Sequence, residues 1–389
     1  MSSQPIRKPQ NPCFSSGPCA KRPGWTPDVL KAALLGRSHR SKPAMARIAE
    51  MIELTRTVLE IPADYHIGLT AGSDTAAIEM AMWNMLGARG VDVFGHEVFS
   101  NGWITDIVDE LKLSDTRVFK VPFGALPDFA QADFSRDVVF TWNGTTSGVI
   151  VPDGNWISDK REGLVFCDAI SAVFGVEMPW DKLDVTTFSW QKALGGEAQH
   201  GMIVLSPRAI ERLRNYTPPW PLPKIFRLAK KGEVMMGFFK GETINTPSLL
   251  CLEDAIDALR WCQDVGGLKK LCQLTQNNFA VIKDWVAKTP WIEFFAADEK
   301  SRSPLAVTLK ITAPEYLALD ETAQRKFNQD LVGRVDAAAA GYDFNNHKGA
   351  PPSLRIWCGP TVAVADVAAL LEWVEWSYDT GFKNLKAQS

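Results

Sequence analysis

Two residues with useful chemistry follow successive apolar runs of the sequence. The first run, Gly163-Leu-Val-Phe-Cys167, leads directly into Asp168, and the second, Val185-Thr-Thr-Phe-Ser189, ends shortly before Lys192. Short β-branched and apolar runs are typical of buried strands in a parallel sheet, whose carboxyl ends hold the ligand in open α/β folds. We therefore expect both side chains at the ligand-binding edge of such a sheet.

An aspartate and a lysine at successive strand ends suit pyridoxal phosphate. A partly desolvated lysine loses affinity for its proton, and its free amine can attack the cofactor aldehyde. A carboxylate against the ring nitrogen keeps that nitrogen protonated, so that the ring can accept electrons from a carbanion. Each residue also has an ordinary alternative, because Lys192 could be a surface lysine at a strand-to-loop junction and Asp168 a turn residue.

The composition is that of an ordinary globular protein. The chain has 389 residues, of which 46% are hydrophobic and 22% charged, with a net charge of -3. No nucleic-acid partner is expected from this balance, and no run reaches the length of a membrane span or the pattern of a signal peptide. The 7 cysteines form no Cys-x-x-Cys pair and the 5 histidines show no ligand spacing, so we expect a reducing cytoplasmic location and no metal site.

Short apolar runs alternate with amphipathic stretches from Tyr65 to Leu213, which is typical of βαβ units. Within them, the turn Ala71-Gly-Ser73-Asp74-Thr75 leads into a helix expected over 76–86, whose N-terminus could bind a phosphate. The same residues would also serve as an ordinary helix cap. A long proline-rich segment, 215–246, follows, and residues 292–378 have the pattern of a small α+β domain.

Three more side chains have candidate roles. Trp103, just before a helix expected over 104–111, could stack on a flat ring, although most buried indoles only pack. Thr145, in the hydroxyl-rich turn 143–148, could bond a ring hydroxyl or simply build the turn. Arg40 suits two-point recognition of a carboxylate or phosphate, although solvated loop arginines are more common.

Together these residues resemble the phosphoserine aminotransferases, in the class V branch of fold-type I pyridoxal-phosphate enzymes. The resemblance runs nearly end to end and includes Phe14-Ser-Ser-Gly-Pro18, Ser38-His39-Arg40, Asp168 with Ser171, Gln191-Lys192, Asn245-Thr246-Pro247, and His347-Lys348 with Arg355. It implies an α/β fold with a mostly parallel seven-stranded sheet in a large domain and a smaller α+β C-terminal domain. The implied boundaries are an arm over 1–26, the large domain over 27–265 and the small domain over 266–389.

The resemblance also implies a role for each candidate residue. Lys192 would carry pyridoxal 5′-phosphate, Asp168 would pair with its ring nitrogen, Trp103 would stack on the ring and Thr145 would bond the ring hydroxyl. The cofactor phosphate would be held by Ser73, Asp74, Thr75 and Gln191, joined by Asn245 and Thr246 from the neighbouring subunit of a homodimer. The substrate positions are His39, Arg40, His347, Lys348 and Arg355. The chain departs from the better-studied bacterial pattern at Ser73-Asp74-Thr75, which replaces a Gly-Gly-Arg-type turn, and at Lys348, which replaces an arginine.

The implied reaction transfers an amino group between L-glutamate and 3-phosphohydroxypyruvate, giving 2-oxoglutarate and O-phospho-L-serine in serine biosynthesis. An alanine:glyoxylate-type aminotransferase, a β-lyase or a cysteine desulfurase would share Asp168 and Lys192. A desulfurase needs a mobile cysteine late in the chain, whereas Cys358 follows a strand-like run where a packed thiol is expected. From another class, a non-catalytic protein that binds a phosphorylated ligand stays open.

Overall fold

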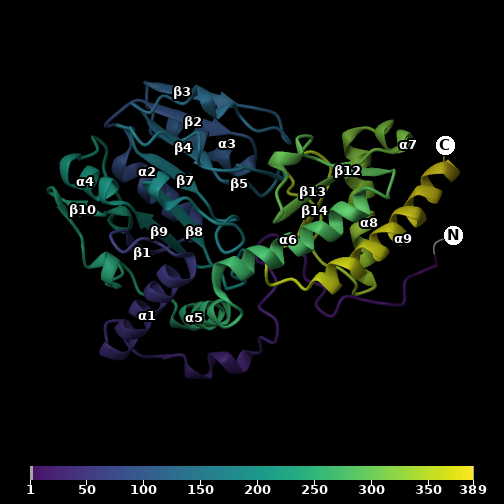
Figure 1. Cartoon of the computed structure of the whole chain (residues 1–389), viewed down its shortest axis with the longest axis horizontal. Helices are drawn as coiled ribbons and strands as arrows, with labels where there is room; N and C mark the ends of the chain where they lie inside the picture. The colour runs from purple at the N-terminus through teal and green to yellow at the C-terminus, as the bar shows by residue number, and fades with distance from the viewer. Residues whose placement is uncertain (1–2, 389) are drawn as a thin grey trace.

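The computed structural model describes residues 3–388. Its larger part is built around a seven-stranded sheet, and a smaller unit around a three-stranded sheet lies beside it (Figure 1). Both ends of the chain lie beside the smaller unit, and the segment before the first long helix runs from there along the molecule to the larger part. No helix within residues 3–388 is long and apolar enough to cross a membrane.

The large sheet is mostly parallel, as predicted. Its strand order is β1-β9-β8-β7-β4-β2-β3, and only β9 runs antiparallel to its neighbours β1 and β8. The strands are β1 (His66–Ala71), β2 (Val91–Gly95), β3 (Thr116–Lys120), β4 (Asp137–Thr141), β7 (Val165–Asp168), β8 (Val185–Ser189) and β9 (His200–Leu205). The prediction of an α/β fold around such a sheet is confirmed.

Both faces of this sheet are covered, which explains why its strands are continuously apolar. Adjacent strand residues point to opposite faces, and Val165 and Phe166 belong to two different hydrophobic clusters. The helices of the larger part are α1 (Lys42–Leu59), α2 (Ser73–Met85), α3 (Val98–Thr105), α4 (Pro207–Asn215) and α5 (Leu249–Asp264). Helix α3 begins before Trp103 and continues as a π-helical turn over Asp106–Glu110, so the helix start expected at residue 104 is wrong.

The chain then forms the smaller unit. Its elements are α6 (Gly267–Val286), β12 (Ile292–Phe294), β13 (Ala306–Ile311), α7 (Pro314–Leu317), α8 (Glu321–Ala337), β14 (Leu354–Trp357) and α9 (Val364–Gln388). Two short hairpins are made by β5 (Asn143–Gly144) with β6 (Val149–Ile150) and by β10 (Ala229–Lys230) with β11 (Glu233–Val234). Short 3-10 helices span Pro27–Ala32, Phe129–Gln131, Trp180–Lys182, Lys224–Phe226, Phe238–Lys240 and Glu299–Ser301.

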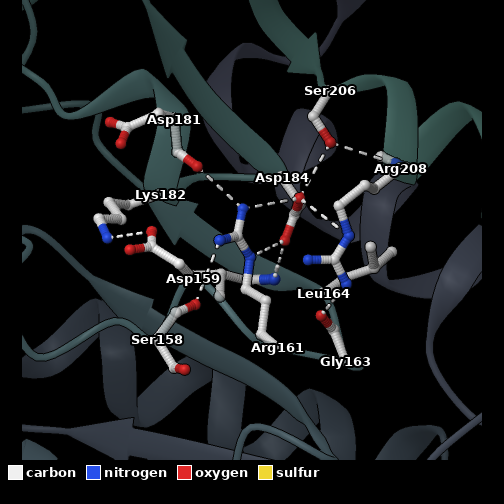
Figure 2. Close-up of polar contacts among 12 residues, drawn as sticks. Ser158, Asp159, Arg161, Gly163, Leu164, Asp181, Lys182, Asp184, Ser206 and Arg208 are labelled. Atoms are coloured by element: carbon white, nitrogen blue, oxygen red, sulfur yellow. Dashed lines mark hydrogen bonds and ion pairs between the residues drawn. The ribbon is translucent and has the colours of Figure 1, made fainter.

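At the amino ends of the strands, buried aspartates are paired with arginines. Figure 2 shows Asp184, just before β8, which accepts hydrogen bonds from Arg161 Nε at 2.9 Å and from Ser206 Oγ at 3.0 Å. Asp137, the first residue of β4, is bound in the same way by both terminal nitrogens of Arg212, at 2.8 and 2.9 Å. A buried carboxylate needs such partners to remain charged, so this end of the sheet is a closed structural network.

The N-terminal arm joins the two parts of the molecule at the opposite end of the sheet. Trp357 of β14 donates its backbone N–H to the carbonyl of Phe14 at 3.2 Å, and Cys19 N–H donates to the carbonyl of Gln191 at 2.8 Å. Residues 14–19 therefore run between the smaller unit and the end of β8, directly over Lys192.

Candidate active site

Lys192 and Asp168 lie at the carboxyl ends of adjacent parallel strands, as the sequence predicted. Asp168 is the last residue of β7, paired in register with Thr187 of β8, and Lys192 follows β8 by three residues. A tight turn, closed by the N–H of Gly195 to the Lys192 carbonyl at 2.9 Å, directs the chain away from the sheet. The two side chains thus face the same edge.

The amine of Lys192 is buried, with 8% of the residue exposed, and Nζ donates to the carbonyl oxygen of Ser16 in the arm. Burial lowers the pKa of Lys192, and the positive charge of Arg355 lowers it further. Loss of the proton leaves a neutral amine, which is both a nucleophile and a base.

The carboxyl group of Asp168 is 1% exposed and is held by two donors. The indole Nε1–H of Trp103 donates to Oδ2 at 3.0 Å, and the N–H of Ile170 donates to Oδ1 at 3.1 Å. Burial raises the pKa of Asp168, while these hydrogen bonds act in the opposite direction. The predicted stacking role of Trp103 stays a prediction, and its polar edge has the additional task of orienting Asp168.

At the N-terminus of α2, the structure brings together some of the predicted phosphate ligands. Gly72, with φ +86°, precedes the helix, and Ser73 Oγ lies 3.0 Å from Ser189 Oγ and accepts from Gln191 Nε2 at 2.8 Å. Thr75 is exposed nearby, whereas the Asp74 side chain turns inward and is buried against Asp168. Ser73 and Gln191 therefore adjoin an exposed helix N-terminus, where an anion is favoured.

Glu97 is a site residue that the sequence interpretation missed. It caps α3, its Oε1 accepting from Ser100 N at 2.8 Å and its Oε2 from Thr146 Oγ1 at 2.7 Å, next to the buried Thr145. Burial raises the pKa of Glu97 to about 7, and Asp168 adds to the shift. The signal in the sequence is a glutamate three residues before a serine, the reverse of the usual capping box.

Arg355 reaches the same region from β14 of the smaller unit. Burial lowers the pKa of its guanidinium to about 10, and its buried Nε has no hydrogen-bond partner within residues 3–388. His347 shares this electrostatic environment, because burial and the charges of Arg355, Lys348 and Lys192 all lower its pKa. A partly buried guanidinium with an unpartnered Nε is suited to binding the carboxylate of a ligand.

The remaining predicted residues lie elsewhere. His39 and Arg40 line a pocket of about 670 Å³ with Thr243, Ile244 and the basic residues Lys224, Arg227 and Lys230. Asn245 and Thr246 follow this lining directly in the chain. Within residues 3–388, none of His39, Arg40, Asn245 and Thr246 forms a hydrogen bond or ion pair with Lys192 or Asp168. Within the described part of one chain, these four predicted residues are therefore not bonded to the lysine and aspartate at the sheet edge.

The described residues contain no group of three or more histidine, cysteine, aspartate or glutamate side chains able to hold a metal ion. The chemistry available at the sheet edge is that of an amine, a carboxylate and a partly buried guanidinium.

The mostly parallel sheet, with a buried lysine and aspartate at the ends of adjacent strands, defines the class as a fold-type I pyridoxal-phosphate enzyme. No family model matches the chain. A phosphoserine aminotransferase from Methanosarcina mazei is 52% identical over 376 residues, which are 97% of this chain and 99% of that protein. The chain belongs to the phosphoserine aminotransferase family.

Solved structures agree on the fold. The structure of a phosphoserine aminotransferase from Cytophaga hutchinsonii superposes with a TM-score of 0.77 at 20% identity, covering 94% of this chain and 99% of that one. A phosphoserine aminotransferase from Trichomonas vaginalis, described as bound to PLP, has a TM-score of 0.74 at 18% identity and covers 94% and 100%.

Proposed function

We propose that this chain transfers an amino group between L-glutamate and 3-phosphohydroxypyruvate, using pyridoxal 5′-phosphate held by Lys192 and Asp168. The observation that carries the proposal is the buried amine of Lys192 beside the buried carboxyl group of Asp168 at the carboxyl edge of the sheet. The name of the relative from Methanosarcina mazei supports the substrate pair, and the PLP-bound relative supports the cofactor.

The residues present fit this cofactor. Ser16 Oγ, Gln191 Oε1 and Arg355 Nε are buried near Lys192 and lack hydrogen-bond partners within the described chain. Buried polar atoms are nearly always paired in folded proteins, so we expect these atoms to form hydrogen bonds with a bound polar ligand. Ser73 and Gln191 would hold the cofactor phosphate at the start of α2, and Asp168 would pair with the ring nitrogen.

When bound, the cofactor supplies an electron sink that stabilises negative charge at the substrate Cα. The amine of Lys192 takes the proton from the substrate Cα and returns one to the product, because burial favours its neutral form. Trp103 and Ile170 hold the Asp168 carboxylate in one orientation through their N–H groups. The arm covers Lys192 and limits access of water to the amine.

Arg355 would bind the substrate α-carboxylate, because its planar guanidinium can contact both oxygens at once. Lys348 adds positive charge on the same side, which suits an anionic substrate, and His347, whose pKa is lowered, can donate a hydrogen bond as a neutral imidazole. In this proposal His39 and Arg40 bind the distal carboxylate or phosphate of the substrate.

We propose that His39, Arg40, Asn245 and Thr246 complete the site of a second copy in a homodimer. Within residues 3–388 they form no hydrogen bond or ion pair with Lys192 or Asp168, which supports this arrangement, because residues of one subunit can serve the other across a two-fold axis. The basic residues around His39 also suit a phosphorylated ligand.

Mixed dimers test the shared site. Lys192→Ala chains and chains with Asn245→Ala and Thr246→Ala are each expected to be weakly active alone. A heterodimer places both defects around one cofactor and leaves the other site intact, so random mixing restores about a quarter of the parental activity. If mass spectrometry shows subunit exchange and no activity returns, the shared site is wrong.

A substrate panel tests the reaction itself. We expect turnover with L-glutamate and 3-phosphohydroxypyruvate to exceed turnover with alanine and glyoxylate, and no sulfide to form from cysteine. The Lys192→Ala variant is the control for enzyme-dependent transfer. A preference for glyoxylate, or release of sulfide, would select one of the alternative class V activities. No transfer with any pair, together with retained binding of the phosphorylated substrate, would select the non-catalytic binder.

The arm and domain boundaries at residues 26/27 and 265/266, and a cytoplasmic location, stay predictions. Limited proteolysis would test the boundaries, and cell fractionation would test the location.

A further inference from the structure

Two carboxyl groups are buried side by side beneath the candidate active site. Asp74, in the first turn of α2, is 2% exposed, and Asp168, at the end of β7, is 1% exposed. The start of α2 lies on β8, with Ser73 Oγ 3.0 Å from Ser189 Oγ, and Asp168 is the register partner of Thr187 on the same strand. Asp74 and Asp168 are therefore close enough for each to affect the pKa of the other. Within residues 3–388, neither forms an ion pair with a lysine or arginine, in contrast to the buried aspartates at the other end of the sheet.

Two buried carboxylates in contact cannot both stay charged, so the pair shares a proton. Asp168 is the member that is better able to carry the negative charge, because it accepts from the N–H groups of Trp103 and Ile170. Asp74 faces the hydroxyl of Thr187, and its Oδ1 has no hydrogen-bond partner within the described chain.

The position of Asp74 near a helix N-terminus does not reverse this assignment. The helix dipole favours a negative charge by about 0.3–1 kcal/mol. Burial beside a second carboxylate is a larger effect, since such sites raise the pKa of one carboxyl group strongly. Burial, followed by the charge of Asp168, raises the pKa of Asp74 well above its ordinary value.

We propose that Asp74 is a positioning residue whose protonated carboxyl group donates a hydrogen bond to Asp168 and holds that carboxylate ready for the cofactor ring nitrogen. The inference rests on the proposed function for the role of Asp168. It gives Asp168 a third donor beside Trp103 and Ile170. It also changes the expected role of Asp74, whose side chain leaves the phosphate region and so puts no negative charge next to the phosphate.

Two substitutions separate the hydrogen bond from mere packing. Asp74→Asn keeps the size and can still donate through its amide nitrogen, so we expect kcat/KM within about threefold of the parent. Asp74→Ala removes the donor, and loss of a hydrogen bond to a charged group lowers kcat/KM by roughly 10- to 100-fold. The pH dependence of the cofactor absorbance should shift in Asp74→Ala and stay parental in Asp74→Asn.

Infrared difference spectra of the cofactor-free protein give a readout that does not depend on activity. At neutral pH, the parent minus Asp74→Asn should show the C=O band of one protonated carboxylic acid. Glu79→Gln is the matched control, because it makes the same carboxyl-to-amide change further along α2 and outside the site. The parent minus Glu79→Gln spectrum should not contain a protonated-acid C=O band that shifts when Asp168 is replaced by asparagine.

The outcomes are distinguishable from failure of the proposed function. If the protonated-acid band is present but no amino group is transferred, the hydrogen bond from Asp74 is supported and the proposed enzymatic function is refuted. Absence of the band in the Asp74→Asn difference, or Asp74→Asn as impaired as Asp74→Ala, would overturn the donor role. Parental activity of a folded Asp74→Ala variant would overturn it as well. If Asp74→Ala does not fold, the infrared comparison still decides.

Discussion

Substitution of Gly17 by alanine tests how closely the arm encloses Lys192. A Cβ atom at Gly17 would lie 2.6 Å from Lys192 Nζ and 2.9 Å from its Cε. Both distances are shorter than van der Waals contact, so the lysine or the arm must move. Gly17 also has φ +142°, a conformation that costs a residue with a side chain roughly 1–3 kcal/mol.

The expected result is a large loss of rate with a modest loss of stability. A displacement of about 1 Å at a reacting group can reduce the rate about 100-fold. We therefore expect turnover with L-glutamate and 3-phosphohydroxypyruvate to fall about 100-fold, while the free energy of unfolding falls by about 1–3 kcal/mol. Steady-state kinetics and urea unfolding measure the two quantities on the same sample.

Gly36→Ala is the matched control. Gly36 also has positive φ, +72°, but a Cβ there would meet nothing within 4 Å. This variant should lose stability through backbone strain and keep its turnover. If Gly17→Ala and Gly36→Ala have the same turnover within threefold, the arm does not constrain Lys192 and its proposed covering role is refuted.

Four other variants test the remaining assignments. Lys192→Ala should lower turnover by roughly 100- to 10,000-fold with an unchanged far-ultraviolet circular dichroism spectrum, and turnover within tenfold of the parent would show that another group moves the proton. Arg355→Ala should raise the KM for L-glutamate roughly 10- to 100-fold, and an unchanged KM would place the carboxylate elsewhere. Because burial raises the pKa of Glu97 from 4.5 to about 7, the folded protein retains its proton longer than the unfolded chain, and stability falls as pH rises through that interval. Glu97→Gln should remove about 3 kcal/mol of this fall in urea unfolding at pH 5 and pH 8, and identical pH slopes would contradict the shift. Asp184→Asn should lower the free energy of unfolding by about 3–5 kcal/mol, because it leaves the guanidinium of Arg161 without its buried partner, and should leave turnover unchanged.

The sheet and the pair at its edge were predictable because local sequence determines them. Runs that are buried on both faces must be apolar throughout, so a charged residue at the end of such a run is conspicuous. Asp168 after β7 and Lys192 after β8 are of this kind. The order of the strands and the adjacency of β7 and β8 then bring the two side chains to one edge.

Glu97 and the start of α3 were missed because their signals are weak in the sequence. Glutamate is not among the residues preferred at helix N-caps, so a helix beginning at Val98 was not expected. Glu97 acquires its role from Ser100 within the helix and from Thr146, which lies about fifty residues later. The second contact depends on the packing of α3 against the turn after β4.

The orientation of Asp74 was also not predictable from its neighbours in the sequence. In the sequence Gly-Ser-Asp-Thr it has the pattern of an ordinary cap or phosphate turn, and its chain neighbours Ser73 and Thr75 do lie at the exposed helix end. Its inward orientation depends on Asp168 and Thr187, on strands that follow much later in the chain. The residue pattern of one helix could not have predicted that Asp74 lies beside the carboxyl group of Asp168.

Charged groups at the amino end of the large sheet are ion-paired within the fold, whereas those near its carboxyl end are not, in the part of the chain that the structure describes. The unpaired groups are the ones proposed to react with or bind the substrate. At the amino ends, Asp137 and Asp184 each have an arginine within hydrogen-bonding distance, so their charges are compensated inside the fold. At the carboxyl ends, Arg355 reaches the site from β14 of the smaller unit; within residues 3–388 it has no ion-pair partner, and burial lowers the pKa of its guanidinium. An uncompensated cation in a buried site costs free energy until an anion arrives. The substrate carboxylate that the proposed reaction requires supplies that anion, so the same arrangement that destabilises the empty site favours binding of the substrate.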